Sequence, residues 1–134
     1  MRHFTPEEAN AALDDVRPLV ERMVDARRSH VAALERQEEL ESHIRGNGGG
    51  IPPAELAETA AEVERLEREL AHAVDELAGL GVQVKDLDEG LVDFPALRHG
   101  ETVLLCWKLG EDEVAYWHTV EGGFAGRRRL PLDE

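Results

Sequence analysis

The sequence predicts an α+β fold, in which a long antiparallel helical hairpin, kinked near Pro18, carries a small antiparallel β-sheet at its C-terminal end. Residues 1–81 consist mostly of Ala, Glu, Leu and Arg, with apolar residues spaced by three and four as in amphipathic helices. Residues 82–134 instead hold β-branched and aromatic runs separated by glycine-containing turns. A chain of 134 residues is expected to be a single domain, 1–134, with a helical hairpin (1–81) and a small β region (82–134).

The first helix has a clear start signal. Thr5 is a suitable N-cap, Pro6 fits the first helical turn because its missing N–H is not needed there, and Glu8 completes a capping box. Pro18 lies within the apolar repeat that follows. Because proline removes a helical hydrogen bond and clashes with the preceding turn, we expect a kink or a break near Val16–Arg17, with a short helix followed by a long one.

The second helix has the more regular pattern. The glycine-rich run 46–50 is expected to end the first helix, and Pro53 suits the start of the next. Apolar or small residues then recur in heptads, in two interleaved sets: Leu56, Val63, Leu70 and Leu77, and Thr59, Leu66, Ala73 and Leu80. Such a repeat is typical of a coiled-coil seam. It predicts antiparallel packing of the two helices and, because self-association is its ordinary use, a homodimer formed through the helices.

The β region reads as a series of short strands. The expected strands, in chain order, are 82–86, 90–95, 102–108, 113–120 and 124–130. The segment 90–95 is expected to close at Pro95. The strands 102–108 and 113–120 flank an acidic turn and predict a β-hairpin.

Composition limits the classes of function. The net charge of −14 argues against nucleic-acid binding, because an acidic surface repels phosphate backbones. No apolar run approaches the roughly 20 residues that a membrane helix needs, and the first ten residues lack the apolar core of a secretory signal. With one cysteine, no internal disulfide is possible, and we expect a cytoplasmic protein without a membrane partner.

The stretch from Glu101 to His118 concentrates the residues that could carry chemistry. Asp93, Cys106, Glu111 and His118 are all residue types that bind transition metals, and their thiolate, imidazole and carboxylate donors suit zinc or ferrous iron. Paired strands of a hairpin would bring Cys106 and His118 close together. The spacing matches neither CxxC nor HExxH, so the prediction depends on the fold.

The same residues allow two other interpretations. Cys106 could act as a nucleophile with His118 as its base and a carboxylate to orient the histidine. Alternatively, Cys106 is a small buried hydrophobe and His118 a hydrogen-bonded structural residue.

Trp107, Trp117 and Arg127 are candidates for contacting a ligand. The tryptophans could line a small-molecule pocket or could form the core that seals the sheet against the helices. Since successive strand residues point to opposite faces, Cys106 and Trp107 must diverge, as must Tyr116 and Trp117. Arg127, within an arginine cluster, could hold an anion or could pair with the protein's own carboxylates.

Long motifs in the chain resemble those of a family of small prokaryotic proteins known as domain of unknown function 2203. They are FTPEEAN at 4–10, VRPLV at 16–20, GVQVKDLDEGLVDFP at 81–95, LCWKLGEDEVAYWH at 105–118 and GFAGR at 123–127. The resemblance implies the same helical hairpin with a small β region. It implies no activity and assigns no catalytic residue.

Three functions follow from these observations. The first is a small non-enzymatic cytoplasmic protein that dimerises through its helices and holds a divalent metal ion or a small ligand at the β region. The second is a small metal-dependent or cysteine-based enzyme that uses the same residues. The third is a protein–protein interaction module whose polar residues are structural.

Overall fold

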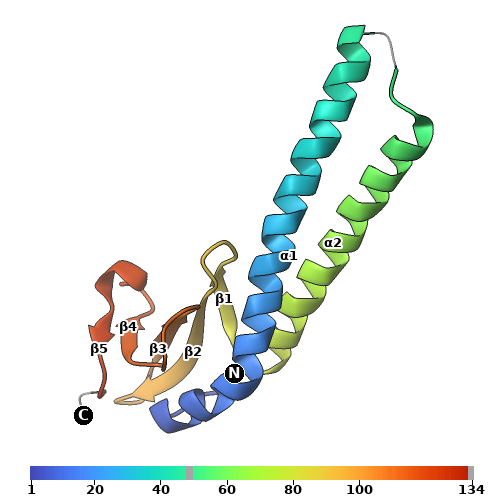
Figure 1. The fold of residues 1–134 in the computed structure, drawn as a ribbon. Helices are drawn as coiled ribbons and strands as arrows, with labels where there is room; N and C mark the ends of the chain where they lie inside the picture. The colour runs from blue at the N-terminus through green and yellow to red at the C-terminus, as the bar shows by residue number, and fades with distance from the viewer. Residues whose placement is uncertain (48–49, 133–134) are drawn as a thin grey trace.

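The structure, a computed structural model, describes residues 1–47 and 50–132. Within these residues the chain forms two long helices, a five-stranded antiparallel sheet and a short 3-10 helix (Figure 1). The elements are α1 (Pro6–Asn47), α2 (Pro53–Gly79), β1 (Gln83–Asp86), β2 (Leu91–Arg98), β3 (Glu101–Lys108), β4 (Tyr116–Thr119), the 3-10 helix η1 (Phe124–Gly126) and β5 (Arg128–Arg129). The predicted fold class, a helical hairpin followed by a small antiparallel sheet, is confirmed.

Helix α1 begins with the predicted capping box. The backbone N–H of Thr5 donates to Glu8 Oε1 at 2.8 Å, and the backbone N–H of Glu8 donates to Thr5 Oγ1 at 3.1 Å. The helix then continues through Pro18 without interruption, so the expectation of two separate helices is wrong. Its N-terminal third is angled against the rest (Figure 1), as a proline kink predicts. Val16 and Val20, on either side of Pro18, are fully buried, and their packing holds the helix together across the lost hydrogen bond.

Helices α1 and α2 pack as an antiparallel hairpin. Ion pairs that join them include Arg22–Glu76 at 3.9 Å and Arg36–Glu62 at 3.0 Å. The later residue of α1 thus pairs with the earlier residue of α2, as antiparallel helices require. The buried residues of α2 are Thr59, Val63, Leu66, Ala73 and Leu77, all members of the predicted seam. The seam is therefore covered by α1 of the same chain.

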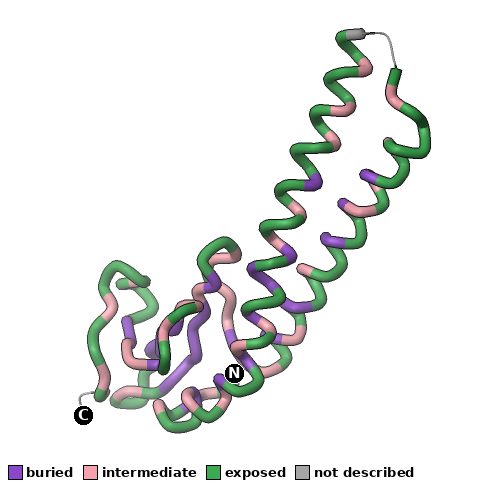
Figure 2. Tube along the Cα trace, in the orientation of Figure 1, coloured by how far each residue is buried: buried purple, intermediate pink, exposed green. Residues whose placement is uncertain are grey.

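The far end of the hairpin is less well covered than its base. Figure 2 shows buried residues concentrated where the helices meet the sheet, while the distal part of α1 is mostly exposed. The glycine-rich run expected to end the first helix includes residues 48–49, which lie outside the described residues, and α1 itself runs to Asn47. Neither helix in the described part of the chain has the length and apolarity needed to cross a membrane.

The sheet has the strand order β1-β2-β3-β4-β5, so every strand pairs with its neighbour in the chain. Strands β2 and β3 are joined by a tight turn in which His99 and Gly100 both have positive φ, 52° and 77°, as a two-residue hairpin turn requires. The expectation that the 90–95 segment closes at Pro95 is wrong, because β2 continues to Arg98. The Pro95 carbonyl accepts a hydrogen bond from the backbone N–H of Phe4 at 2.7 Å, which ties this strand to the start of the chain.

The remaining strands are shorter than predicted. Strand β4 begins at Tyr116 instead of 113, and residues 113–115 belong to the loop before it. The expected strand 124–130 is divided into η1 and the two-residue β5. The predicted hairpin is nevertheless present, since β3 and β4 pair antiparallel, with Leu104 opposite His118.

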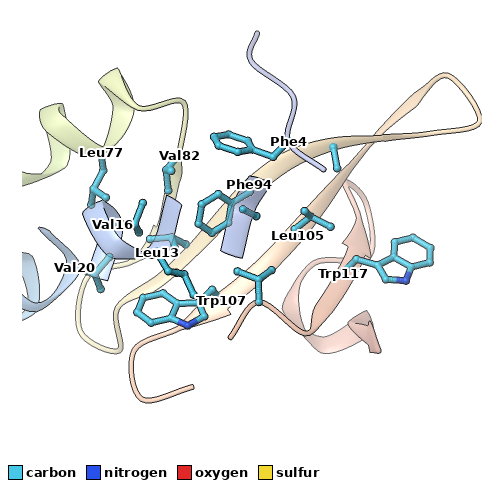
Figure 3. Close-up of a cluster of buried hydrophobic side chains, with 14 of the residues drawn as sticks. Phe4, Leu13, Val16, Val20, Leu77, Val82, Phe94, Leu105, Trp107 and Trp117 are labelled. Carbon is cyan, nitrogen blue, oxygen red and sulfur yellow. The ribbon is translucent and has the colours of Figure 1, made fainter. Parts of the chain in front are cut away.

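The two faces of the sheet differ in character. The inner face carries Val92, Phe94, Leu105, Trp107 and Trp117, which belong to the main hydrophobic core together with residues of α1 and α2 (Figure 3). Alternation along the strands therefore turns Asp93, Leu104, Cys106 and His118 to the outer face, away from this core.

Candidate metal centre

Three of the four predicted metal ligands meet on the outer face of the sheet. Asp93 lies on β2 directly opposite Cys106 on β3, and His118 lies on the next strand, β4. One ligand atom from each residue can be chosen so that all of them lie within 4.8 Å of one another. All three side chains are buried, which is ordinary for a cysteine but uncommon for an aspartate. We call these residues the Asp93–Cys106–His118 cluster.

The imidazole of His118 is held in a defined orientation. Its Nδ1 lies 2.8 Å from the carbonyl oxygen of Thr119, and because a carbonyl oxygen only accepts, Nδ1 carries a proton. Its Nε2 lies 3.1 Å from Asp93 Oδ2. In the neutral imidazole Nε2 then carries the lone pair, which is the arrangement found when a histidine binds a metal through one nitrogen and donates from the other. Without a metal, one proton must lie between Nε2 and Oδ2.

The carboxyl group of Asp93 is only partly satisfied. Among the described residues, its Oδ1 is buried and has no hydrogen-bond partner. Burial raises the pKa of Asp93, an effect that the neighbouring His118 opposes in part. A buried acceptor without a donor is uncommon because it is costly, and a cation would satisfy it.

Cys106 is a protonated thiol in the metal-free protein at neutral pH. Burial, and secondarily the charge of Asp93, raise its pKa from 9.0 to about 11. Since the thiolate is the reactive form, this environment makes Cys106 a poor nucleophile by itself. A bound divalent ion would reverse the preference, because a coordinating thiol loses its proton.

Glu111, the fourth predicted ligand, lies outside the cluster. Its Oε2 pairs with Arg127 Nη2 at 2.7 Å, and its Oε1 accepts from the backbone N–H of Lys108 at 2.9 Å. Arg127 is thus held by one of the protein's own carboxylates. Its Nη1 approaches the sulfur of Cys106 at 3.8 Å, and its guanidinium lies over the ring of Tyr116. Arg127 therefore borders the cluster from the side of the thiol.

The two predicted aromatic ligand contacts lie on the other side of the sheet. Trp107 and Trp117 are buried members of the main core, and Figure 3 shows them on either side of Leu105. Trp107 Nε1 donates to the carbonyl oxygen of Glu111 at 3.0 Å, which satisfies its polar atom within the protein. The structure thus gives both tryptophans the core position that was the alternative to a ligand pocket.

A pocket of about 290 Å³ opens onto the cluster from the outer face, and Asp93 and His118 form part of its lining. We call it the outer pocket. Its further lining residues include Gln83, Lys85, Leu91, Thr102, Leu104 and Val120. The sequence prediction did not single out these residues. The alternation of β1 indicates that Gln83 and Lys85 share one face of the sheet. It does not indicate whether that face packs on the helices or lies opposite them.

The arrangement has the composition of a transition-metal site. A carboxylate, a thiolate and an imidazole match the donors that zinc and ferrous iron accept in proteins. Catalytic zinc sites commonly have three protein ligands and one open position, whereas structural sites have four. Because the outer pocket borders Asp93 and His118, an open position would face this pocket.

Comparisons with curated proteins and with solved structures find no match to either. The model of a protein family described as an uncharacterized conserved protein, DUF2203, matches residues 2–130. Since this match covers nearly the whole chain, including both helices and every strand of the sheet, the protein belongs to the DUF2203 family.

Proposed function

We propose that this is a small non-enzymatic cytoplasmic protein that binds one divalent transition-metal ion, zinc or ferrous iron, at Asp93, Cys106 and His118. The observation that supports it best is the convergence of three buried ligand side chains from three strands, with their ligand atoms within 4.8 Å. The unpartnered Asp93 Oδ1 and the Nδ1–H of His118 fixed by a backbone carbonyl are further support. A single cysteine with no disulfide partner agrees with the reducing cytoplasm.

The main competing explanation is a structural one. A buried Asp93–His118 pair beside a buried thiol could serve only to hold the sheet together. A buried ion pair is weak evidence for added stability, however, because hydrophobic residues of similar volume often stabilise a fold as well or better. The pair also leaves Asp93 Oδ1 unsatisfied, which a purely structural role does not explain.

Metal analysis tests the proposal directly. The protein should be purified without a metal-affinity tag and its metal content measured by mass spectrometry. We expect about one zinc or iron per chain, because a structural or catalytic ion binds with fixed stoichiometry. In the metal-free protein, addition of Co²⁺ should produce a sulfur-to-cobalt charge-transfer band. Cys106→Ala should abolish this band, and His118→Ala should lower the Co²⁺ affinity at least tenfold.

Control variants are available at exposed positions. His72 has an exposed side chain on α2, and Asp88 has an exposed side chain in the turn before β2. His72→Ala and Asp88→Asn should leave metal content and the cobalt spectrum unchanged. Folded wild-type protein that contains no metal and takes up no Co²⁺ would refute the metal site and favour the interaction module.

A metal-dependent enzyme is the second candidate, and the outer pocket is the observation that favours it. A zinc-bound water facing this pocket would have a pKa near neutrality and could attack an ester. Hydrolysis of 4-nitrophenyl acetate by the zinc-loaded protein, lost in the metal-free form and in His118→Ala, would support this candidate. Equal rates in all three samples would argue against the enzyme and favour the non-enzymatic binding protein. The raised pKa of Cys106 argues against the cysteine-based enzyme.

Dimerisation through the helices remains a prediction. The seam of α2 packs on α1 within the chain, so a dimer would need other apolar residues. Val31 and Leu34, on the distal part of α1, are exposed. We propose that a second copy covers them, because two apolar side chains on one helix face would otherwise remain in water. Leu34→Glu should convert a dimer, measured by light scattering after size exclusion, to a monomer. A monomeric wild type would contradict this.

A further inference from the structure

The outer pocket has the lining of a small-molecule site, and we infer that it binds a small carboxylate with an aliphatic body. This inference rests on the proposed metal function, because the carboxylate would occupy the open coordination position beside Asp93 and His118. The pocket volume of about 290 Å³ lies at the lower end of the range for ligand pockets, which favours a short chain over a long one.

Apolar side chains gather around this pocket. Leu91 and Leu104 belong to its lining, and Met1, Val120 and Phe124 line it as well. Those last three are half of the exposed large hydrophobic side chains in the described part of the chain, the others being Val31, Leu34 and Leu97. Exposed apolar side chains that cluster around a concave site mark a binding surface for an apolar group. The walls therefore suit an aliphatic chain.

The positive charges at the pocket determine which polar group the ligand should carry. One carboxylate and one thiolate would balance the two positive charges of a divalent ion, so the loaded cluster would be neutral. Lys85, on the outer face of β1, adds a positive charge to the lining and acts electrostatically on Asp93, but no ion pair of its ammonium is seen within the described residues. The other lysine of the chain, Lys108, lies 3.6 Å from Glu89 and does not line the pocket. A metal ion and an unpaired ammonium at one pocket favour an anion, and oxygen donors suit the open position.

The aliphatic body and the anionic end make separate predictions. Lengthening the chain from acetate to butanoate to hexanoate should raise the affinity by about two- to fourfold for each added methylene that enters the pocket. At pH 7, replacing the carboxylate by an alcohol, which is a weak neutral metal ligand, or by an amine, which is protonated and has no lone pair for the metal, should lower the affinity at least tenfold, since the attraction of the carboxylate to Lys85 is also lost.

The experiment uses the full chain loaded with Co²⁺ and follows two signals. The sulfur-to-cobalt band reports whether the metal is bound, and the ligand-field bands report whether acetate, butanoate or hexanoate enters its coordination sphere. Calorimetry gives the affinities of hexanoate, hexan-1-ol and hexylamine. We expect hexanoate to bind most tightly and to change the ligand-field bands, with no such change for hexylamine.

Matched variants assign the two ends of the ligand. Lys85→Gln should weaken hexanoate binding about two- to fivefold, because the ammonium is exposed, and Lys108→Gln should not weaken it. Val120→Gln should reduce the gain in affinity with chain length, whereas Leu97→Gln, at an exposed apolar residue of β2 that does not line the pocket, should leave this gain intact.

The two proposals fail in different ways. If the cobalt band forms but hexanoate binds no better than hexan-1-ol or hexylamine, the metal site stands and the carboxylate inference is overturned. If hexanoate binds but Lys108→Gln weakens it as much as Lys85→Gln does, the assignment to the outer pocket is wrong. If no cobalt band forms, the metal function fails and the inference fails with it.

Discussion

Asp93 Oδ2 and His118 Nε2 lie 3.1 Å apart, although the two residues are separated by 25 positions and by the whole of strand β3. The contact is possible because both side chains leave the same face of the sheet and lean across the strand between them. Cys106, on that middle strand, completes the cluster. The proposed metal site therefore needs all three strands, and a change in their register would separate its three ligands.

Asp93→Asn should separate the metal role of this residue from its structural role. With EDTA present we expect the free energy of unfolding at pH 7 to change by no more than about 1 kcal/mol, because the amide of Asn has the same volume and can donate a hydrogen bond to His118 Nε2 in place of the carboxyl group. With Zn²⁺ present, the added stability of the wild type should be largely absent from the variant. Urea unfolding measures both, and Asp88→Asn is the control. Equal stabilisation of wild type and Asp93→Asn by Zn²⁺ would show that Asp93 is not a ligand.

The raised pKa of Asp93 also predicts how the stability of the metal-free protein changes with pH. It is raised in the folded state, chiefly by burial, so the folded protein holds this proton at pH values where the unfolded chain has lost it. The contribution of Asp93 to stability is therefore largest at low pH and declines as the pH rises above about 4. Relative to the metal-free wild type, metal-free Asp93→Asn should gain stability with rising pH. A constant difference between the two proteins across this range would contradict the burial argument.

Cys106 should cause a second, alkaline loss of stability. Its pKa is raised from 9.0 to about 11 in the folded protein, so the unfolded chain releases the proton first. The metal-free wild type should lose about 1–3 kcal/mol of unfolding free energy between these two values, relative to Cys106→Ala. Urea unfolding at a series of pH values in EDTA measures the difference. If wild type and Cys106→Ala show the same slope, the thiol does not have a raised pKa.

The periodicity of the strands predicted part of this site. Alternation required Cys106 and Trp107 to face opposite sides, and the hairpin formed by β3 and β4 put Cys106 and His118 on neighbouring strands. Both expectations agree with the observed register. For the two tryptophans the sequence left two alternatives, a position in the core or in a ligand pocket. Choosing between them required knowing which face of the sheet packs on the helices.

Other features depended on contacts that local patterns do not contain. The position of Asp93 opposite Cys106 follows from the tight turn at His99 and Gly100, where a non-glycine residue adopts positive φ. Glu111 was grouped with the ligands because of its residue type, but Arg127, 16 positions further on, draws its carboxylate away. Local rules likewise allowed either a kink or a break at Pro18, and the helix is continuous there because its buried neighbours preserve it.

Gly90 should be necessary for docking the sheet onto α1. It has a φ of 69°, and an added Cβ would lie 2.8 Å from Val20 Cγ1 and 3.0 Å from Val24 Cγ2. Gly100 is the matched control, because its φ of 77° is similar but nothing lies within 4 Å of the added atom. Gly100→Ala should cost about 1 kcal/mol from backbone strain, and Gly90→Ala about 1–3 kcal/mol more from overpacking. Equal losses in urea unfolding would mean that α1 moves freely to make room.

Arg127 should tune the metal-bound thiolate without binding the metal itself. Its Nη1 lies 3.8 Å from Cys106 Sγ, while Glu111 and the ring of Tyr116 hold the guanidinium in place. A hydrogen bond to a coordinated sulfur stabilises the sulfur electrons, so its removal should shift the sulfur-to-cobalt band of Arg127→Met to lower energy. The Co²⁺ affinity should fall about tenfold or more, as for other partners of metal ligands. Arg129→Met is the control, because Arg129 contacts Tyr116 but has no contact with the sulfur among the described interactions. An unshifted band in Arg127→Met, with the control also unchanged, would show that the guanidinium only packs beside the thiol and does not donate to it.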